Sequence, residues 1–147
     1  MANSNKLTNN KNKSIYNCPS IVLLVIGLVD LLRGFLHTYQ VNWAAETFAK
    51  LDLSVVRSDQ LTLLGAFGIS NILTGLIYIL ISRKAKDLSP YVLGIIPIAY
   101  FFGFIGLKFS GINSTASFYG KYFMLVYLSV CVVTCIIFFY RKKRQIK

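Results

Sequence analysis

The chain has 147 residues, of which 55% are hydrophobic and only 14% are charged. Soluble domains carry roughly 25% charged residues, and a chain of this size has too little interior to bury so much apolar surface, so a soluble globular protein is excluded. The net charge of +11 does not indicate nucleic-acid binding, because the basic residues form short clusters between apolar runs and no nucleic-acid motif is present.

The chain begins with a polar tail, residues 1–19, which is rich in Asn, Lys and Ser and is expected to be a disordered cytoplasmic segment. Four apolar runs follow, each close to the roughly 20 residues that a helix needs to cross a bilayer. Their predicted bounds are 20–38, 61–82, 91–109 and 122–140. Because the runs lack the period-two alternation of strands, they predict an all-α membrane protein, a bundle of four transmembrane helices. Residues 141–147 form a basic cytoplasmic tail.

The segment between the first two runs predicts a short helix that begins at Asn42, whose side chain suits an N-cap. Trp43 suits the membrane interface. Three apolar residues then share one side: Phe48, Leu51 and Val55. We expect this helix to lie flat on the outer surface of the membrane.

Lys and Arg are distributed unevenly among the segments outside the spans. Most of the 16 lie in the N-terminal tail, the loop after the second span and the C-terminal tail: Lys6, Lys11, Lys13, Arg83, Lys84, Lys86, Arg141, Lys142, Lys143, Arg144 and Lys147. Four spans place these three segments on one side, and the positive-inside rule makes that side cytoplasmic. The sequence therefore predicts a multi-pass protein of the plasma (inner) membrane, N-in/C-in, with anionic lipids bound at the basic C-terminal tail.

The first span contains three ionisable residues, Asp30, Arg33 and His37, which lie within about 60° of one another on a helix. Asp or Arg at a span centre costs about 2.5–3.5 kcal/mol, whereas each Leu, Ile, Val or Phe returns about 0.3–0.6 kcal/mol. This cost is lower if Asp30 pairs with Arg33 at i, i+3 and both side chains face the protein interior. Two interpretations stay open: such residues usually mark function, but the pair also suits a structural staple between helices.

The other spans carry small or polar residues at matching depths. The second span has a face of Gly65, Gly68, Asn71 and Gly75, which suits close helix packing. Tyr100 shares a face with two glycines of the third span, Gly103 and Gly106, and Tyr127 shares a face with Met124 and Cys131 of the fourth. If these faces converge, they form a polar pocket that opens outward. Its predicted ligand-binding residues are Asp30, Arg33, His37, Asn71, Tyr100 and Tyr127.

Several chemistries are disfavoured by the residues present. A single histidine cannot provide bis-histidine haem ligation or a multi-histidine metal site, so no cofactor and no metal are expected. Cys131 and Cys135 lie in the fourth span, and Cys18 lies at the inner end of the first. None of the three is on the predicted outer side, which argues against a disulfide framework. No phosphate-binding loop or nucleophile elbow is present, which makes an enzyme the less favoured interpretation.

Three function hypotheses follow. The leading one is a membrane protein that binds or transports a small polar or amphipathic ligand, or a proton, with His37 as a pH-sensitive gate. The alternative is an accessory subunit of a larger membrane complex, or a homo-oligomer, with glycine faces as the contact surface. The third is a lipid- or quinone-modifying enzyme in which Asp30 and His37 act as acid and base. The layout resembles that of small four-helix bacterial membrane proteins, including the DoxX-like group, in architecture only, and no motif matches a family residue by residue.

Overall fold

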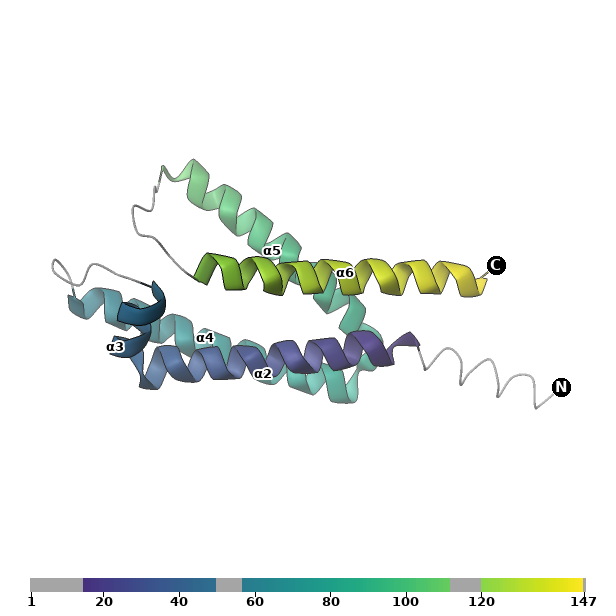
Figure 1. Ribbon diagram of the computed structural model, residues 1–147, viewed down its shortest axis with the longest axis horizontal. Coiled ribbons are helices and arrows are strands. Elements are labelled where there is room, and N and C mark those ends of the chain that lie inside the picture. Colours follow the sequence, from purple (N-terminus) through teal and green to yellow (C-terminus); the bar gives the residue numbers. More distant parts are fainter. Residues whose placement is uncertain (1–14, 50–56, 112–119, 147) are drawn as a thin grey trace.

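The computed structural model describes residues 15–49, 57–111 and 120–146, and over these residues it contains helices and no strand. The four long helices are α2 (Asn17–Tyr39), α4 (Arg57–Lys84), α5 (Ser89–Phe109) and α6 (Gly120–Ile146) (Figure 1). The short ones are α3 (Val41–Ala44), the π-helix η1 (Ala45–Ala49) and the 3₁₀ turn η2 (Lys86–Leu88). Each long helix is of a length and hydropathy that suit a membrane span. Over the described residues, the predicted all-helical fold with four helices long and apolar enough to span a membrane is therefore confirmed.

Two of the long helices extend into the predicted tails. α2 begins at Asn17, inside the predicted N-terminal tail, and α6 continues through the basic tail to Ile146. Lys and Arg are good helix formers, and their charges near the C-terminus of α6 favour the helix dipole. The basic tail is therefore largely helical, while residues 1–14 of the predicted N-terminal tail lie outside the described residues.

The segment between α2 and α4 differs from its prediction in one respect. Asn42 is not an N-cap, because Gln40 precedes α3 and Asn42 lies within the helix, where its Oδ1 accepts a hydrogen bond from Arg57 Nη2 at 3.0 Å. Trp43 and Phe48 are exposed and pack edge to face, with ring centroids 5.1 Å apart. The remaining two residues of the predicted apolar side, Leu51 and Val55, lie outside the described residues.

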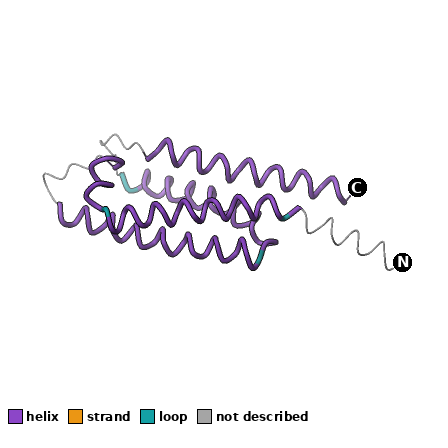
Figure 2. The backbone as a smooth tube through the Cα atoms, turned by 60° about the horizontal axis from the view of Figure 1, so that its bottom comes forward, coloured by secondary structure: helices purple, strands orange, loops and turns teal. Residues whose placement is uncertain are grey.

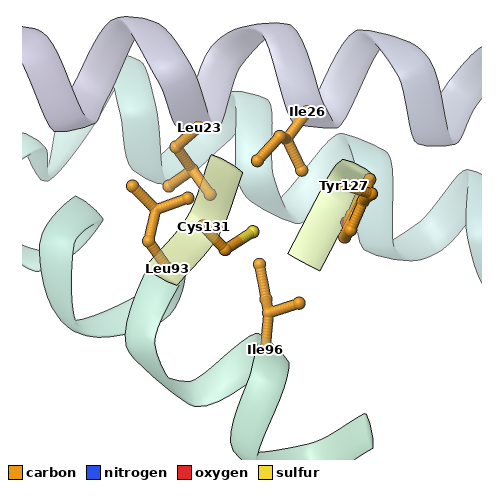
Figure 3. Close-up of a cluster of buried hydrophobic side chains, with 6 residues drawn as sticks. All are labelled: Leu23, Ile26, Leu93, Ile96, Tyr127 and Cys131. Carbon is orange, nitrogen blue, oxygen red and sulfur yellow. The ribbon is translucent and has the colours of Figure 1, made fainter. Parts of the chain in front are cut away.

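α2 is the central helix. It packs antiparallel to α4 along most of its length and also contacts α5 and α6, and Figure 2 shows α2 and α4 as the closest pair of long helices. The buried hydrophobic cluster joins α2, α5 and α6, and Figure 3 shows its six side chains converging. They are Leu23, Ile26, Leu93, Ile96, Tyr127 and Cys131.

Small residues repeat every seven positions along the contact between α2 and α4. Ser20, Gly27 and Gly34 on α2 lie opposite Ser82, Gly75 and Gly68 on α4. The Oγ of Ser20 donates a hydrogen bond to the backbone oxygen of Ser82 at 2.5 Å. A Cβ built at Gly27 would lie 2.9 Å from the Gly75 oxygen, and one at Gly34 would lie 2.8 Å from the Gly68 oxygen. The two backbones are thus in direct contact, as small residues permit in membrane helices.

This close contact sets the register between the two helices. A seven-residue repeat keeps one seam of an α-helix facing its partner, and no larger side chain fits at the glycine positions without a shift of backbone. The register places Asn71, which lies between Gly68 and Gly75 on the same buried face of α4, against α2. The glycines therefore decide which polar side chain of α4 reaches the ionisable residues of α2.

α5 diverges from the other helices after Ile96. Its first half packs on α2 and α6, whereas in its distal half, residues 98–109, every residue except Ile105 is exposed. In Figure 1 the end of α5 points away from α2 and α4. A Cβ built at Gly103 or Gly106 meets nothing within 4 Å among the described residues. The distal half of α5 thus has no packing partner in the described part of this chain.

A candidate intramembrane polar site

Asp30 and Arg33 lie one turn apart on α2 and form an ion pair, with Arg33 Nη2 3.4 Å from Asp30 Oδ1. Asp30 is only 2% exposed, and the Arg33 side chain is 16% exposed. Full ionisation at such a depth is costly unless the groups are paired and hydrogen-bonded. The partners that α4 and α6 provide therefore decide what the pair can do.

Tyr127 of α6 provides the partner of Asp30. Its phenol donates a hydrogen bond to Asp30 Oδ2 at 2.9 Å, and the tyrosine is itself buried. It lies on the face of α6 that is buried against α2 and α5, together with Cys131. This hydrogen bond links α2 to α6 and holds the carboxylate in one orientation.

Arg33 is held by neutral groups of two other helices. Its Nη2 donates to Asn71 Oδ1 of α4 at 2.7 Å, and its Nη1 donates to Met124 Sδ of α6 at 3.1 Å. Its Cζ lies 5.6 Å from the centre of the Phe67 ring, within cation–π range. These contacts hold the guanidinium between α4 and α6 in one orientation.

Several buried polar atoms of this cluster have no hydrogen-bond partner among the described residues. They are Asp30 Oδ1, Arg33 Nε and Asn71 Nδ2, and, one turn further along α2, His37 Nδ1 and Thr38 Oγ1. Buried polar atoms in native proteins are nearly all paired with protein, water or ligand. In addition, a thioether is a weak acceptor for a charged donor. The cluster is thus rigidly built and still incompletely satisfied.

Four of the six predicted site residues meet in this cluster: Asp30, Arg33, Asn71 and Tyr127. His37 is half-buried and lies beside Phe67, with ring centroids 6.1 Å apart. Tyr100 is 40% exposed and makes no hydrogen bond to the cluster within the described ranges. It shares a helix face with the buried Leu93 and Ile96, so its phase fits the expected convergence, but α5 diverges before reaching the cluster.

Sequence reasoning did not identify Met124 and Phe67 as partners of Arg33. Met124 precedes the predicted Tyr127 by three residues and so shares its face, which is the one signal that could have found it. Phe67 carries no such signal, because an aromatic residue in a membrane span is ordinary. Both contacts depend on the angle between helices rather than on the pattern within one.

The other reactive groups take no part in the cluster's hydrogen bonds. Cys18 is exposed and Cys131 is buried, both as free thiols, and Cys135 Sγ donates to the Pro90 oxygen at 3.6 Å. Over the described ranges, no group of three or more His, Cys, Asp or Glu side chains is placed to hold a metal ion.

Comparison with known proteins adds no relative: no family model, curated protein or solved structure matches this chain. The chemistry of the cluster is that of a recognition site, with one carboxylate, one guanidinium and an amide presented in fixed directions inside an apolar environment.

Proposed function

We propose that the chain is a four-helix bundle of the plasma (inner) membrane with both termini in the cytoplasm. The starts of α2 and α5 and the ends of α4 and α6 lie at one end of the molecule, where the rings of Tyr16 and Phe138 are 5.3 Å apart. Seven basic residues and a single acid, Asp87, lie at this end among the described residues. The basic residues are Arg83, Lys84, Lys86, Arg141, Lys142, Lys143 and Arg144. This charge asymmetry supports the cytoplasmic assignment of that end.

The basic end also supports a role for anionic lipids. Lys142 Nζ donates to Tyr91 Oη at 3.2 Å, which holds one ammonium close to α5. Neighbouring exposed basic residues on α6 then face the headgroup region, where each contributes about 1 kcal/mol of attraction to an anionic surface. We propose that this contact orients the protein and has no further role.

We propose further that the protein binds a small polar or amphipathic ligand at the cluster of Asp30, Arg33, Asn71 and Tyr127, in the outer half of the membrane. One observation carries this proposal. Arg33 is fixed by Asn71 and Met124, yet its Nε is buried and has no hydrogen-bond partner among the described residues. Such an oriented and unsatisfied donor is what a ligand's acceptor oxygen requires.

A structural staple is the competing explanation, since the same contacts join α2 to α4 and α6. A staple accounts for the three hydrogen bonds, but it does not account for the atoms left unpaired. Each buried unpaired donor costs about 1–3 kcal/mol, and among the described residues two of them, Arg33 Nε and Asn71 Nδ2, lie in one cluster beside Asp30 Oδ1, which is ion-paired but accepts no hydrogen bond. A bound molecule removes this cost, so the ligand proposal explains both the paired and the unpaired atoms.

Native mass spectrometry of the protein, extracted gently from its own membrane, tests the proposal. We expect a reproducible small-molecule adduct on the wild-type chain that is lost on Asp30→Asn and on Arg33→Gln. Arg57→Gln is the matched control, because the polar contacts of Arg57 within the described residues, with Asn42 and Glu46, are exposed. No adduct on the wild-type protein, or one that survives both cluster variants, would refute a ligand at Arg33.

An accessory subunit is the second candidate, and the distal half of α5 favours it. Gly68 and Gly75 were expected to serve a partner, but they are occupied by α2 of the same chain. Gly103 and Gly106 remain open. Under this candidate, replacing both with Leu removes a co-purifying membrane protein of fixed stoichiometry, and the same replacement leaves the adduct of the first proposal in place.

An enzyme using Asp30 and His37 as an acid–base pair has less support. Asp30 is hydrogen-bonded to Tyr127 and ion-paired with Arg33. His37 lies beyond Arg33 along α2 and makes no side-chain hydrogen bond to Asp30 in the part of the chain that the structure describes. The pair therefore lacks the shared reach that a proton-transfer mechanism needs.

A further inference from the structure

We infer that the ligand has an uncharged polar head in which a hydroxyl group lies next to an acceptor oxygen, attached to an apolar chain, as in a monoacylglycerol. This inference rests on the proposed function, since it describes the molecule bound at the same cluster. It is carried by three properties of the site: its charge balance, its unpaired atoms and its surroundings.

The charges of the cluster already cancel. Asp30 contributes one negative charge and Arg33 one positive charge, and their other partners are a phenol, an amide and a thioether. The neighbouring titratable groups are an imidazole, a phenol and a thiol: His37 on α2, Tyr78 on α4 and Cys131 on α6. A charged ligand head would therefore enter an apolar region without a counter-charge, which is strongly unfavourable.

The unpaired atoms specify what a neutral head must supply. Within the described ranges, Arg33 Nε and Asn71 Nδ2 are donors without an acceptor, and Asp30 Oδ1 is an acceptor without a hydrogen bond. All three belong to groups that meet at Arg33 Nη2, which is 2.7 Å from Asn71 Oδ1 and 3.4 Å from Asp30 Oδ1. A carbonyl or ether oxygen next to a hydroxyl satisfies both kinds of atom at once.

The surroundings favour an apolar chain on the ligand. Arg33 Cζ lies 5.6 Å from the centre of the Phe67 ring, and Phe67 is 49% exposed. In a membrane this exposed surface faces hydrocarbon, so the approach to Arg33 is from the lipid rather than from water. A molecule that reaches the cluster by this route must itself partition into the bilayer, and its chain stays beside Phe67 when its head reaches Arg33.

Binding of four lipids with the same acyl chain tests the inference on the full-length protein in dodecyl maltoside micelles. The probes are 1-monoolein, methyl oleate, oleate and oleylamine, titrated separately and read by native mass spectrometry. Methyl oleate lacks the hydroxyl and the other two carry a charge. We expect 1-monoolein to bind about tenfold or more tightly than each of the others, because a hydrogen bond to a charged group contributes at least one decade of affinity.

Variants locate the binding. Arg33→Gln and Asn71→Leu are expected to weaken 1-monoolein binding about tenfold, and Arg57→Gln is expected to leave it unchanged. If a cluster variant does not fold, the ranking of the four probes on the wild-type chain still decides. Equal or tighter binding of oleate, oleylamine or methyl oleate overturns the inference, and so does the absence of 1-monoolein binding, which is the result expected if water alone fills the site. If 1-monoolein fails either of these tests but the wild-type protein still carries its native small-molecule adduct, the inference is wrong and the proposed function stands. If the wild-type protein carries no native adduct, both the inference and the proposed function are wrong.

Discussion

The glycine contact between α2 and α4 yields the sharpest stability prediction. A Cβ placed at Gly75 would lie 2.7 Å from the Gly27 oxygen and 2.9 Å from the Leu31 nitrogen. Both atoms belong to backbone, so relief requires a shift of one helix relative to the other. Overpacking of this kind costs about 1–3 kcal/mol. Gly75→Ala is therefore expected to destabilise the protein despite the better helix propensity of alanine.

Gly103→Ala is the matched control. It gives the same gain in helix propensity, about 1 kcal/mol, and its new Cβ meets nothing within 4 Å among the described residues. The propensity terms cancel in the comparison, so the free energy of unfolding of Gly75→Ala should lie about 1–3 kcal/mol below that of Gly103→Ala. Equilibrium unfolding in mixed micelles, followed by circular dichroism, measures this difference. A difference below about 0.5 kcal/mol, the size of an ordinary surface effect, would refute direct backbone contact between α2 and α4.

The remaining predictions concern the polar cluster and the topology. Tyr127→Phe leaves Asp30 Oδ2 without its donor and should lower the free energy of unfolding by about 1–3 kcal/mol; an unchanged value contradicts the hydrogen bond. Arg33→Gln alone should lower the free energy of unfolding by about 3–5 kcal/mol, because it leaves a buried carboxylate without its counter-charge. Adding Asp30→Asn should recover most of that loss; additive losses would show that the two groups are not coupled. Cys18, exposed at the start of α2, should react with a membrane-impermeant maleimide only in permeabilised cells, while Ser110→Cys should react in intact cells; the reverse pattern contradicts cytoplasmic termini.

Hydropathy was sufficient to predict the four long helices, because a run of about 20 apolar residues has few structures available other than a spanning helix. Helical phase and depth were sufficient to bring Asp30, Arg33, Asn71 and Tyr127 together. Asp30, Arg33 and Asn71 lie on α2 and α4, which pack along most of their lengths, and Tyr127 lies where α6 meets α2, so the phase of each helix translates into a contact there.

Tyr100 shows that helical phase alone does not predict every contact between helices. Its phase on α5 matches that of Leu93 and Ile96, which are buried in the hydrophobic cluster, but phase within a helix carries no information on the crossing angle between helices. That angle takes the distal half of α5 away from α2. Asn42 shows a second limit, since its residue type suits an N-cap, yet the helix starts one residue earlier and its side chain binds Arg57 instead.

The seven-residue repeat of Ser20, Gly27 and Gly34 against Gly68, Gly75 and Ser82 is present in the sequence itself. Glycine is frequent in membrane helices, so single glycines carry little information. The matched spacing on two consecutive helices carries much more, because an antiparallel pair brings equally spaced small residues opposite one another. Read in this way, the repeat predicts both the closest helix pair and the register that places Asn71 beside Arg33.

The central claim is that Arg33 and its neighbours bind a molecule rather than only holding three helices together. An experimental density map of the protein, extracted with its native lipids and never exposed to added amphiphile, tests this most directly. We predict continuous density that begins within hydrogen-bonding distance of Arg33 Nε and Asn71 Nδ2 and extends as a chain past Phe67. An empty space there, or isolated water-sized features paired with these atoms, would show that the cluster is a staple and would contradict the claim.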